Sequence, residues 1–149
     1  MQDGDTLRMG RRSFAAADGS MIKKIASIPV ANGAGLSPDG KTVNVSDTIV
    51  GRLRAMMMTG PGTVSPGPLL SMPGTVMQML LGYQWADSLK VAHGGNICVG
   101  TIYTGAITVF SPEGDIEQLH VPDMFPTNLC FGGADMRGLW ITASSTGKI

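Results

Sequence analysis

The 149-residue sequence predicts an all-β fold of short strands joined by tight turns. Glycine and proline are frequent, with 21 Gly and 9 Pro, and they are spread along the chain and not gathered into one linker. Turn residues at this density leave room for strands but interrupt helices. The apolar runs are short and broken by polar residues, as in strands with one buried face. A chain of this length is expected to form a single domain.

Charge and hydropathy exclude several classes of partner. Eleven Lys and Arg residues balance eleven Asp and Glu residues, so the formal net charge is zero. A neutral chain without a basic stretch is a poor match for nucleic acid or an anionic membrane surface. Residues 1–20 lack the apolar stretch of a secretory signal, and no apolar run is long enough to span a bilayer. We therefore expect a cytoplasmic protein with no nucleic-acid or membrane partner.

The cysteines and histidines do not form a recognisable reactive site. Cys98 and Cys130 lie in apolar, strand-like runs and are too few and too far apart for a zinc site. We expect buried thiols, with a disulfide as the alternative. His93 and His120 have no Ser or Cys at a spacing typical of nucleophilic catalysis, so we expect them on the surface or in turns.

One pattern of strand, turn and strand occurs three times. It is seen in ANGAGLSPDGKTVNVSDT from residue 31, ADSLKVAHGGNICVGT from 86 and TNLCFGGADMRGLWITA from 127. In this alignment Asn32, Asp87 and Asn128 share the position that opens the first strand. The intervals are 87 − 32 = 55 and 128 − 87 = 41 residues. A period of about 40 to 50 residues is typical of four-stranded propeller blades, and the Gly- and Pro-rich loop at 59–76 accounts for the longer interval.

The elements follow in order from this repeat. Residues 11–30 are expected to form a blade remnant, a hairpin with its turn at Asp18-Gly19. A blade begins at 31, a second at 86 and an incomplete one at 127, and the segments 51–62, 105–115 and 146–149 add third strands. The prediction is one partial β-propeller domain over residues 1–149, with about three four-stranded blades. A β-sandwich also uses short strands, but it does not predict one polar position repeated at one register.

The repeated polar position suggests a site on the propeller axis. The innermost strand of each blade lines the central channel, so residues that open these strands converge there. Amide and carboxylate oxygens suit calcium or magnesium. The alternative is that each side chain caps its own backbone in a turn, as Asn often does. For Asp87, which lies between Trp85 and an apolar strand, an unpaired buried charge would be costly.

At these residues the sequence resembles the SMP-30/gluconolactonase/LRE-like family, six-bladed propellers that include calcium-dependent lactonases. The resemblance is carried by ANGAGLSPDGKTVNVSDT at 31–48, WADSLKVAHGGNICVGTIYTGAITVFSPEG at 85–114 and PTNLCFGGADMRGLWITASSTGKI at 126–149. These three motifs occur in the family's order and cover, with their flanks, most of residues 11–149. The match is to the C-terminal half of the family fold.

The resemblance implies a chemistry and a role for two residues. Asn32 matches a metal-binding Asn of the family, and Asp87 matches its metal-binding Asp, which is also assigned as the catalytic base. The implied cofactor is Ca²⁺ or another divalent cation such as Mg²⁺, Mn²⁺ or Zn²⁺. The implied reaction is attack of water on a lactone or a related ester, with the cation stabilising the developing negative charge. The family's Glu ligand and its second Asn ligand lie in an N-terminal half that this chain lacks.

The sequence is therefore compatible with two functions. The first is a metal-dependent hydrolase of the gluconolactonase type, incomplete as this chain, whose open sheet edges would pair in a homodimer. The second is a non-catalytic propeller fragment that serves as a binding or vestigial module. For the first, Tyr83, Trp85 and Asn128 are the expected neighbours of the lactone or ester substrate.

Overall fold

The computed structural model describes residues 10–67 and 74–149, and over these residues all regular structure is β. The predicted all-β class is therefore confirmed. The strands are β1 (Gly10–Ala15), β2 (Ile22–Ile28), β3 (Ala31–Leu36), β4 (Thr42–Asp47), β5 (Arg52–Gly60), β6 (Thr63–Val64), β7 (Thr75–Met79), β8 (Trp85–Val91), β9 (Ile97–Ile102), β10 (Ala106–Phe110), β11 (Ile116–His120), β12 (Pro126–Gly132) and β13 (Gly138–Ala143).

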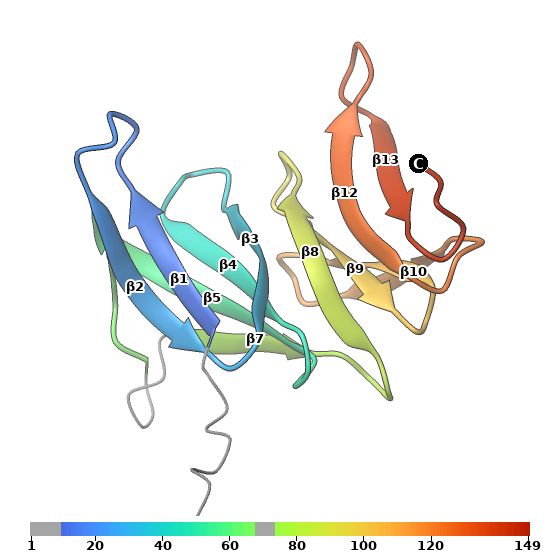
Figure 1. Cartoon of the computed structure of the whole chain (residues 1–149), viewed down its shortest axis with the longest axis horizontal. Coiled ribbons are helices and arrows are strands. Elements are labelled where there is room, and N and C mark those ends of the chain that lie inside the picture. The colour runs from blue at the N-terminus through green and yellow to red at the C-terminus, as the bar shows by residue number, and fades with distance from the viewer. Residues whose placement is uncertain (1–9, 68–73) are drawn as a thin grey trace, which may run out of the picture.

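The strands form antiparallel sheets that follow one another along the chain (Figure 1). β1 and β2 form a two-stranded hairpin. The next sheet has the order β3-β4-β5, continued by β7, with the short β6 also paired to β5. The third sheet has the order β8-β9-β10-β11, and β12 pairs with β13. Because neighbouring strands are consecutive in sequence, each sheet is an up-and-down meander, as in a propeller blade.

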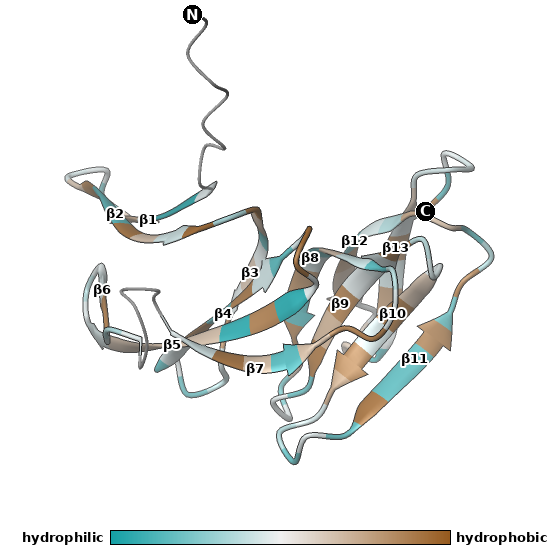
Figure 2. Ribbon diagram, turned by 90° about the horizontal axis from the view of Figure 1, so that it is seen from below, coloured by the Kyte–Doolittle hydropathy of each residue, from teal (hydrophilic) through white to brown (hydrophobic). Residues whose placement is uncertain are grey.

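The sheets pack face to face through their first strands. β3 lies against β8, and β12 lies against β8 and β9 (Figure 1). Between the second and third sheets lies a core that includes Leu53, Leu89, Val99 and Phe110. Apolar side chains from β2 cover the second sheet on its other side, where Ile28, Val45 and Met56 are almost completely buried. The strands show bands of apolar and polar residues in Figure 2, as expected when each sheet buries its faces unequally.

Several local expectations are settled by this structure. The turn at Asp18-Gly19 forms, with Gly19 at φ +74°, and both histidines are exposed as expected. Along β5, Met56 is buried and Met57 is 63% exposed, as alternation in a strand requires. The predicted loop at 59–76 lies partly outside the described residues.

The prediction of two buried thiols is wrong for one of them. Cys98 is buried, whereas Cys130 is exposed, and both are free. Cys98 lies on a face of β9 that Leu129 covers. Cys130 lies on β12 at a position where no further sheet of the described chain packs.

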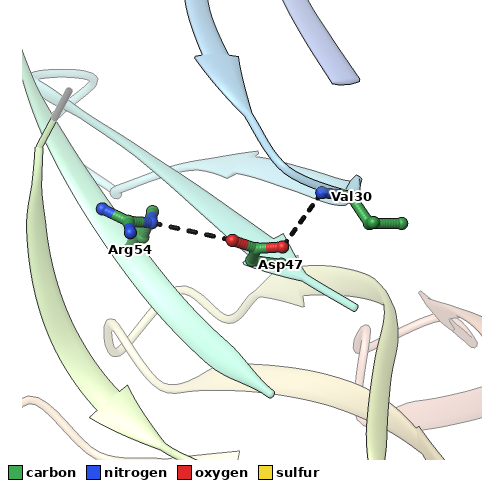
Figure 3. A network of polar contacts seen from close by, with 3 residues as sticks. All are labelled: Val30, Asp47 and Arg54. Carbon is green, nitrogen blue, oxygen red and sulfur yellow. Dashed lines mark hydrogen bonds and ion pairs between the residues drawn. The ribbon is translucent and has the colours of Figure 1, made fainter. Parts of the chain in front are cut away.

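A buried ion pair anchors the turn that leads into β3. Asp47, at the end of β4, accepts a hydrogen bond from the backbone N–H of Val30 at 3.1 Å. The other carboxylate oxygen of Asp47 lies 3.9 Å from Nε of Arg54 on β5, and both side chains are almost fully buried (Figure 3). A buried charge is tolerated only with such partners. The pair therefore fixes where the chain leaves the β1–β2 hairpin and enters β3.

A second carboxylate holds the loops at the C-terminal hairpin together. Asp123 precedes β12 and accepts hydrogen bonds from Phe125, Ser145 and Thr146. Burial by itself raises the pKa of Asp123, but the hydrogen bonds from these three residues outweigh it and hold the pKa well below its ordinary value. The ionised form is therefore the one that fits the loop.

None of the described residues forms a helix that is long and apolar enough to cross a membrane.

Asp123 makes the stability of this region depend on pH. A carboxyl group whose pKa is lower in the folded than in the unfolded chain stabilises the fold above the unfolded pKa and loses that effect as pH falls. We expect the melting temperature to fall as the pH drops below about 4, where the unfolded carboxyl group becomes protonated. In Asp123→Asn this component of the pH dependence should disappear, as thermal melting from pH 3 to 7 would reveal. Equal acid sensitivity of the two proteins would contradict this assignment.

Candidate functional site

All three inner strands carry one extra residue where the polar positions lie. The pairing steps from Ala31 to Ala34 on β3, while β4 advances only from Asp47 to Val45. β8 has the same break between Ala86 and Leu89, opposite Thr101 and Val99. On β12 the break follows Pro126. A break of this kind leaves backbone groups unpaired and re-aims the side chains around it.

The bulge on β3 lies directly against β8. A Cβ atom built on Gly33 would lie 2.3 Å from the backbone N of Leu89 and 2.9 Å from the carbonyl oxygen of Asp87. Only a glycine allows two backbones to approach so closely. The Asn-Gly dipeptide therefore has two functions. The glycine allows the two sheets to pack closely, and the asparagine thereby lies next to the inner strand β8.

Ser46 connects the two bulges through its side chain. The hydroxyl group accepts a hydrogen bond from the N–H of Gly33 at 2.7 Å and donates one to the carbonyl oxygen of Asp87 at 2.5 Å. The serine is completely buried. Because each bulge breaks the sheet's own ladder, this hydroxyl supplies partners that the strands themselves no longer provide.

The contact between the sheets joins Asn32 to Asp87. The side chain of Asn32 and the backbone N–H of Ser88 lie beside the carboxylate of Asp87 and favour its ionised form. Burial is the largest influence and raises the pKa of Asp87, while these two polar neighbours lower it, so the net pKa lies above the ordinary value. A half-buried carboxylate with a raised pKa is a typical feature of a functional site.

Arg12 supports the Asn32 end of this contact from strand β1. Its guanidinium group donates hydrogen bonds to the backbone carbonyl oxygens of Asn32 and, at 3.1 Å, of Gly33. Partial burial lowers the pKa of Arg12. The sequence motifs did not indicate this residue, because its partners are carbonyl oxygens 20 and 21 positions away along the chain.

Asn128 does not occupy the position equivalent to Asn32 and Asp87. Asn32 and Asp87 each follow the last paired residue before the bulge, which is Ala31 on β3 and Ala86 on β8. On β12 that paired residue is Pro126, so the equivalent position is Thr127. The predicted alignment of Asn128 was thus one residue out of register. Its side-chain oxygen accepts the N–H of Leu129 at 2.8 Å, which is the local cap considered as the alternative.

Tyr83 and Trp85 belong to an aromatic cluster at the start of β8, the strand that carries Asp87. Trp85 opens β8 and pairs with Ile102, and Tyr103 follows directly. The ring of Tyr103 lies 5.2 Å from Tyr83 and 5.3 Å from Trp85 between centroids, and Phe125 lies 5.4 Å from Tyr103. Tyr103 has a positive φ of 73°, unusual for a residue with a side chain. The sequence singled out the first two rings, but Tyr103 and Phe125 come from separate loops.

The donor set around Asn32 and Asp87 consists of oxygen atoms. The side-chain carbonyl oxygen of Asn32 and the carboxylate of Asp87 are both hard oxygen donors, which fits a cation such as calcium or magnesium. Among residues 10–67 and 74–149, no group of three or more His, Cys, Asp or Glu side chains could hold a metal ion. A cation at this position would therefore need further ligands from backbone, water or another chain.

Comparison with known proteins identifies the same fold elsewhere. Residues 2–145 match the profile described as SMP-30/Gluconolactonase/LRE-like region. Among solved structures, regucalcin from Agrobacterium tumefaciens, described as a calcium-binding protein, is 24% identical over 90% of this chain with a TM-score of 0.70. A gluconolactonase from Xanthomonas campestris is 20% identical over 95% of the chain, with a TM-score of 0.73. A luciferin-regenerating enzyme is 21% identical over 91%, with a TM-score of 0.75.

The chain spans less than half the length of these structures, namely 47%, 44% and 44% of them. The sheet arrangement and these matches together confirm the predicted partial β-propeller.

The close approach at Gly33 can be tested by substitution. In Gly33→Ala the added Cβ meets the backbone of β8, so the sheets must separate, and we expect a loss of about 2 kcal/mol or more in unfolding free energy. Urea denaturation of Gly33→Ala and of Gly94→Ala, where a Cβ meets nothing within 4 Å, provides the comparison. If the two variants are equally stable, the inner strands are not held at this contact.

Proposed function

Because the chain belongs to the SMP-30/gluconolactonase/LRE-like family, we propose that it contributes the Asp-bearing half of a metal-dependent hydrolase acting on lactones or related esters. The observation that carries this proposal is the close packing of β3 against β8 at Gly33, which brings Asn32 beside Asp87 at the bulges of neighbouring inner strands. Two residues 55 positions apart, each matching a metal-binding position of the family, are thereby held together at one point.

Asp87 is proposed as the base that orients the attacking water and accepts its proton. Its carboxylate is half-buried on β8, where it can accept a proton from a water molecule whose own pKa a bound cation would lower. Asn32 and the backbone of Ser88 lie beside the carboxylate and favour its ionised form. Ser46 positions the peptide group of Asp87. These contacts give the carboxylate one defined orientation toward a bound substrate.

A divalent cation is proposed to bind next to this pair, with Asn32 and Asp87 as two of its ligands. Calcium is the first choice because both residues offer oxygen atoms, and Mg²⁺, Mn²⁺ and Zn²⁺ are the other candidates. When bound, the ion would stabilise negative charge on the carbonyl oxygen of the substrate. The described residues supply one carboxylate at this point, so the remaining ligands must come from outside this pair.

The aromatic cluster is the proposed neighbour of the substrate. Tyr83 is 74% exposed, and Trp85 begins the strand that carries Asp87 two residues later. Flat aromatic faces next to a carboxylate suit a cyclic ester, whose C–H groups pack on the ring while its carbonyl group points toward polar residues. Asn128 remains a proposed substrate contact through its amide nitrogen, since its oxygen is bonded to Leu129.

The second candidate is a non-catalytic propeller fragment. It is favoured by the small number of acidic and thiol ligands, because no group of three lies together in the described part of the chain. Sheet packing through Gly33 and Ser46 accounts for the fold without any ion. The following two experiments separate the two candidates.

Calcium binding can be measured through thermal stability. A ligand that binds only the folded chain stabilises it by RT ln(1 + [L]/Kd), which is about 2.7 kcal/mol when the ligand concentration is 100 times Kd. We expect the melting temperature to rise with calcium in the millimolar range and the rise to be absent in Asp87→Asn. An unchanged melting temperature in the folded wild-type chain would favour the non-catalytic fragment.

Removal of the carboxylate should abolish hydrolysis without unfolding the chain. In Asp87→Asn the proposed base is lost while the size and most hydrogen-bonding capacity remain, so lactone hydrolysis should fall by about 10²- to 10⁴-fold. Asp115→Asn, in an exposed turn between β10 and β11, is the matched control and should retain full activity. Undiminished lactonase activity in Asp87→Asn would remove this mechanism.

A further inference from the structure

One interface between sheets is formed twice within the chain. In the third sheet, the cross-strand pairs Leu89–Val99 and Val91–Ile97 face the second sheet and form its core contact. In the last hairpin the equivalent pairs face the third sheet, and they are Leu129–Ile141 and Phe131–Leu139. Each sheet thus presents two apolar pairs, at the same register, to the sheet before it.

The second sheet has two equivalent pairs, but in the described part of the chain their residues on the inner strand β3 are not covered. The equivalent pairs are Ala34–Val45 and Leu36–Val43. Val45 is fully buried because β2 covers it, whereas Ala34 is exposed and Leu36 is 53% exposed. In the described part of the chain, no inner strand lies in front of Ala34 and Leu36, although β3 lies in front of the equivalent positions on β8, and β8 lies in front of those on β12.

The surface that would complete this interface is exposed on the last hairpin, at the other end of the molecule. On β8 and β9 the pair Lys90–Cys98 faces away from the second sheet, and Leu129 of the next hairpin buries Cys98. The equivalent pair in the last hairpin is Cys130–Trp140. Cys130 is exposed and Trp140 is 59% exposed. The chain therefore presents, on two distant surfaces, the two complementary halves of a contact that it closes elsewhere.

The strand pairs at the two ends are complementary as well. β12 and β13 correspond to the first two strands of a sheet, since β12 packs in line with β3 and β8. β1 and β2 correspond to the last two, since β2 leads directly into the inner strand β3 as β7 leads into β8. The free edges are therefore β13 and β1. Among residues 10–67 and 74–149, Ala143 alone on β13 is bridged by a following residue, Lys148, and the rest of this edge has no strand partner.

We propose that two copies of this chain join end to end and close a ring. The β1–β2 hairpin of each copy completes the β12–β13 sheet of the other, and the face of Cys130 and Trp140 covers Ala34 and Leu36 of the other copy. Each copy contributes two complete sheets and two half-sheets, so two copies give six four-stranded sheets.

Such a ring has a consequence for the proposed cation site. The two Asn32–Asp87 pairs would face each other across one channel, so the ligands that one copy lacks would come from the second copy. This consequence rests on the proposed function, whereas the association itself does not. Calcium binding at one ion per two chains would connect the two proposals.

The proposed contact predicts one specific crosslink. Cys130 stands where Gly35 stands in the second sheet, and a Cβ on Gly35 would lie 3.0 Å from Cγ2 of Val91. Leu36 stands where Val91 stands. In Leu36→Cys, the new thiol should therefore lie within disulfide reach of Cys130 of a second copy.

The experiment compares this variant with a control of similar exposure. Leu36→Cys is oxidised mildly at micromolar concentration beside Leu119→Cys, whose site on β11 is 46% exposed and outside the contact. We expect a reducible dimer in Leu36→Cys at least tenfold more abundant than in Leu119→Cys, and none when Cys130→Ser is added. Equal crosslinking of the two variants would overturn the proposal.

The unmodified chain provides a second readout that does not depend on a substitution. Light scattering of the purified 149-residue protein should give twice the chain mass of 15.5 kDa, with or without calcium, and no larger species. A dimer that binds no calcium would support the ring and would contradict only the proposed cation site. A 15.5 kDa monomer up to high micromolar concentration overturns the ring and leaves these surfaces to a different polypeptide.

Discussion

The contact between β3 and β8 at Gly33 is the constraint on which the candidate site depends. The two backbones approach so closely that no side chain fits between them, and the hydroxyl group of Ser46 connects both strands at the same point. Backbone contact of this kind leaves little freedom of position. The geometry of the Asn32–Asp87 pair is therefore set by main-chain packing and not by the flexible side chains themselves.

The polar groups at the bulges are balanced by partners from several elements. Arg12 of β1 donates hydrogen bonds to carbonyl groups on β3, and Ser46 of β4 hydrogen-bonds to both inner strands. Asn32 lies beside the carboxylate on β8. Asp47, paired with Arg54, holds the backbone of Val30 at the entry to β3. Buried polar groups without partners are costly. The site is thus a network in which each inner strand relies on the sheet beside it.

The same dependence explains why the two ends of the molecule look unlike its middle. Within the chain, each apolar face of an inner strand pair is covered by the next sheet, and residues such as Leu89 and Leu129 are buried. At the ends, Leu36 stands where Val91 stands in the third sheet, and Trp140 stands where the buried Cys98 stands, but both remain in solvent. Exposed apolar side chains at repeated interface positions are a common feature of surfaces that bind a further chain. The candidate site lies between these ends, where the sheets are complete.

The sequence by itself determined the fold class, and it pointed to the two residues at the centre of the candidate site. Gly and Pro frequency, strand-length apolar runs and the repeated Asn and Asp positions are local signals, so they predict strands, turns and inner-strand openings from neighbouring residues alone. Tertiary structure decided the rest. The one-residue shift of Asn128, the exposure of Cys130, the support from Arg12 and the addition of Tyr103 and Phe125 to the aromatic cluster all depend on strand register and on which sheet covers which face. These are contacts between distant parts of the chain, and no local pattern encodes them.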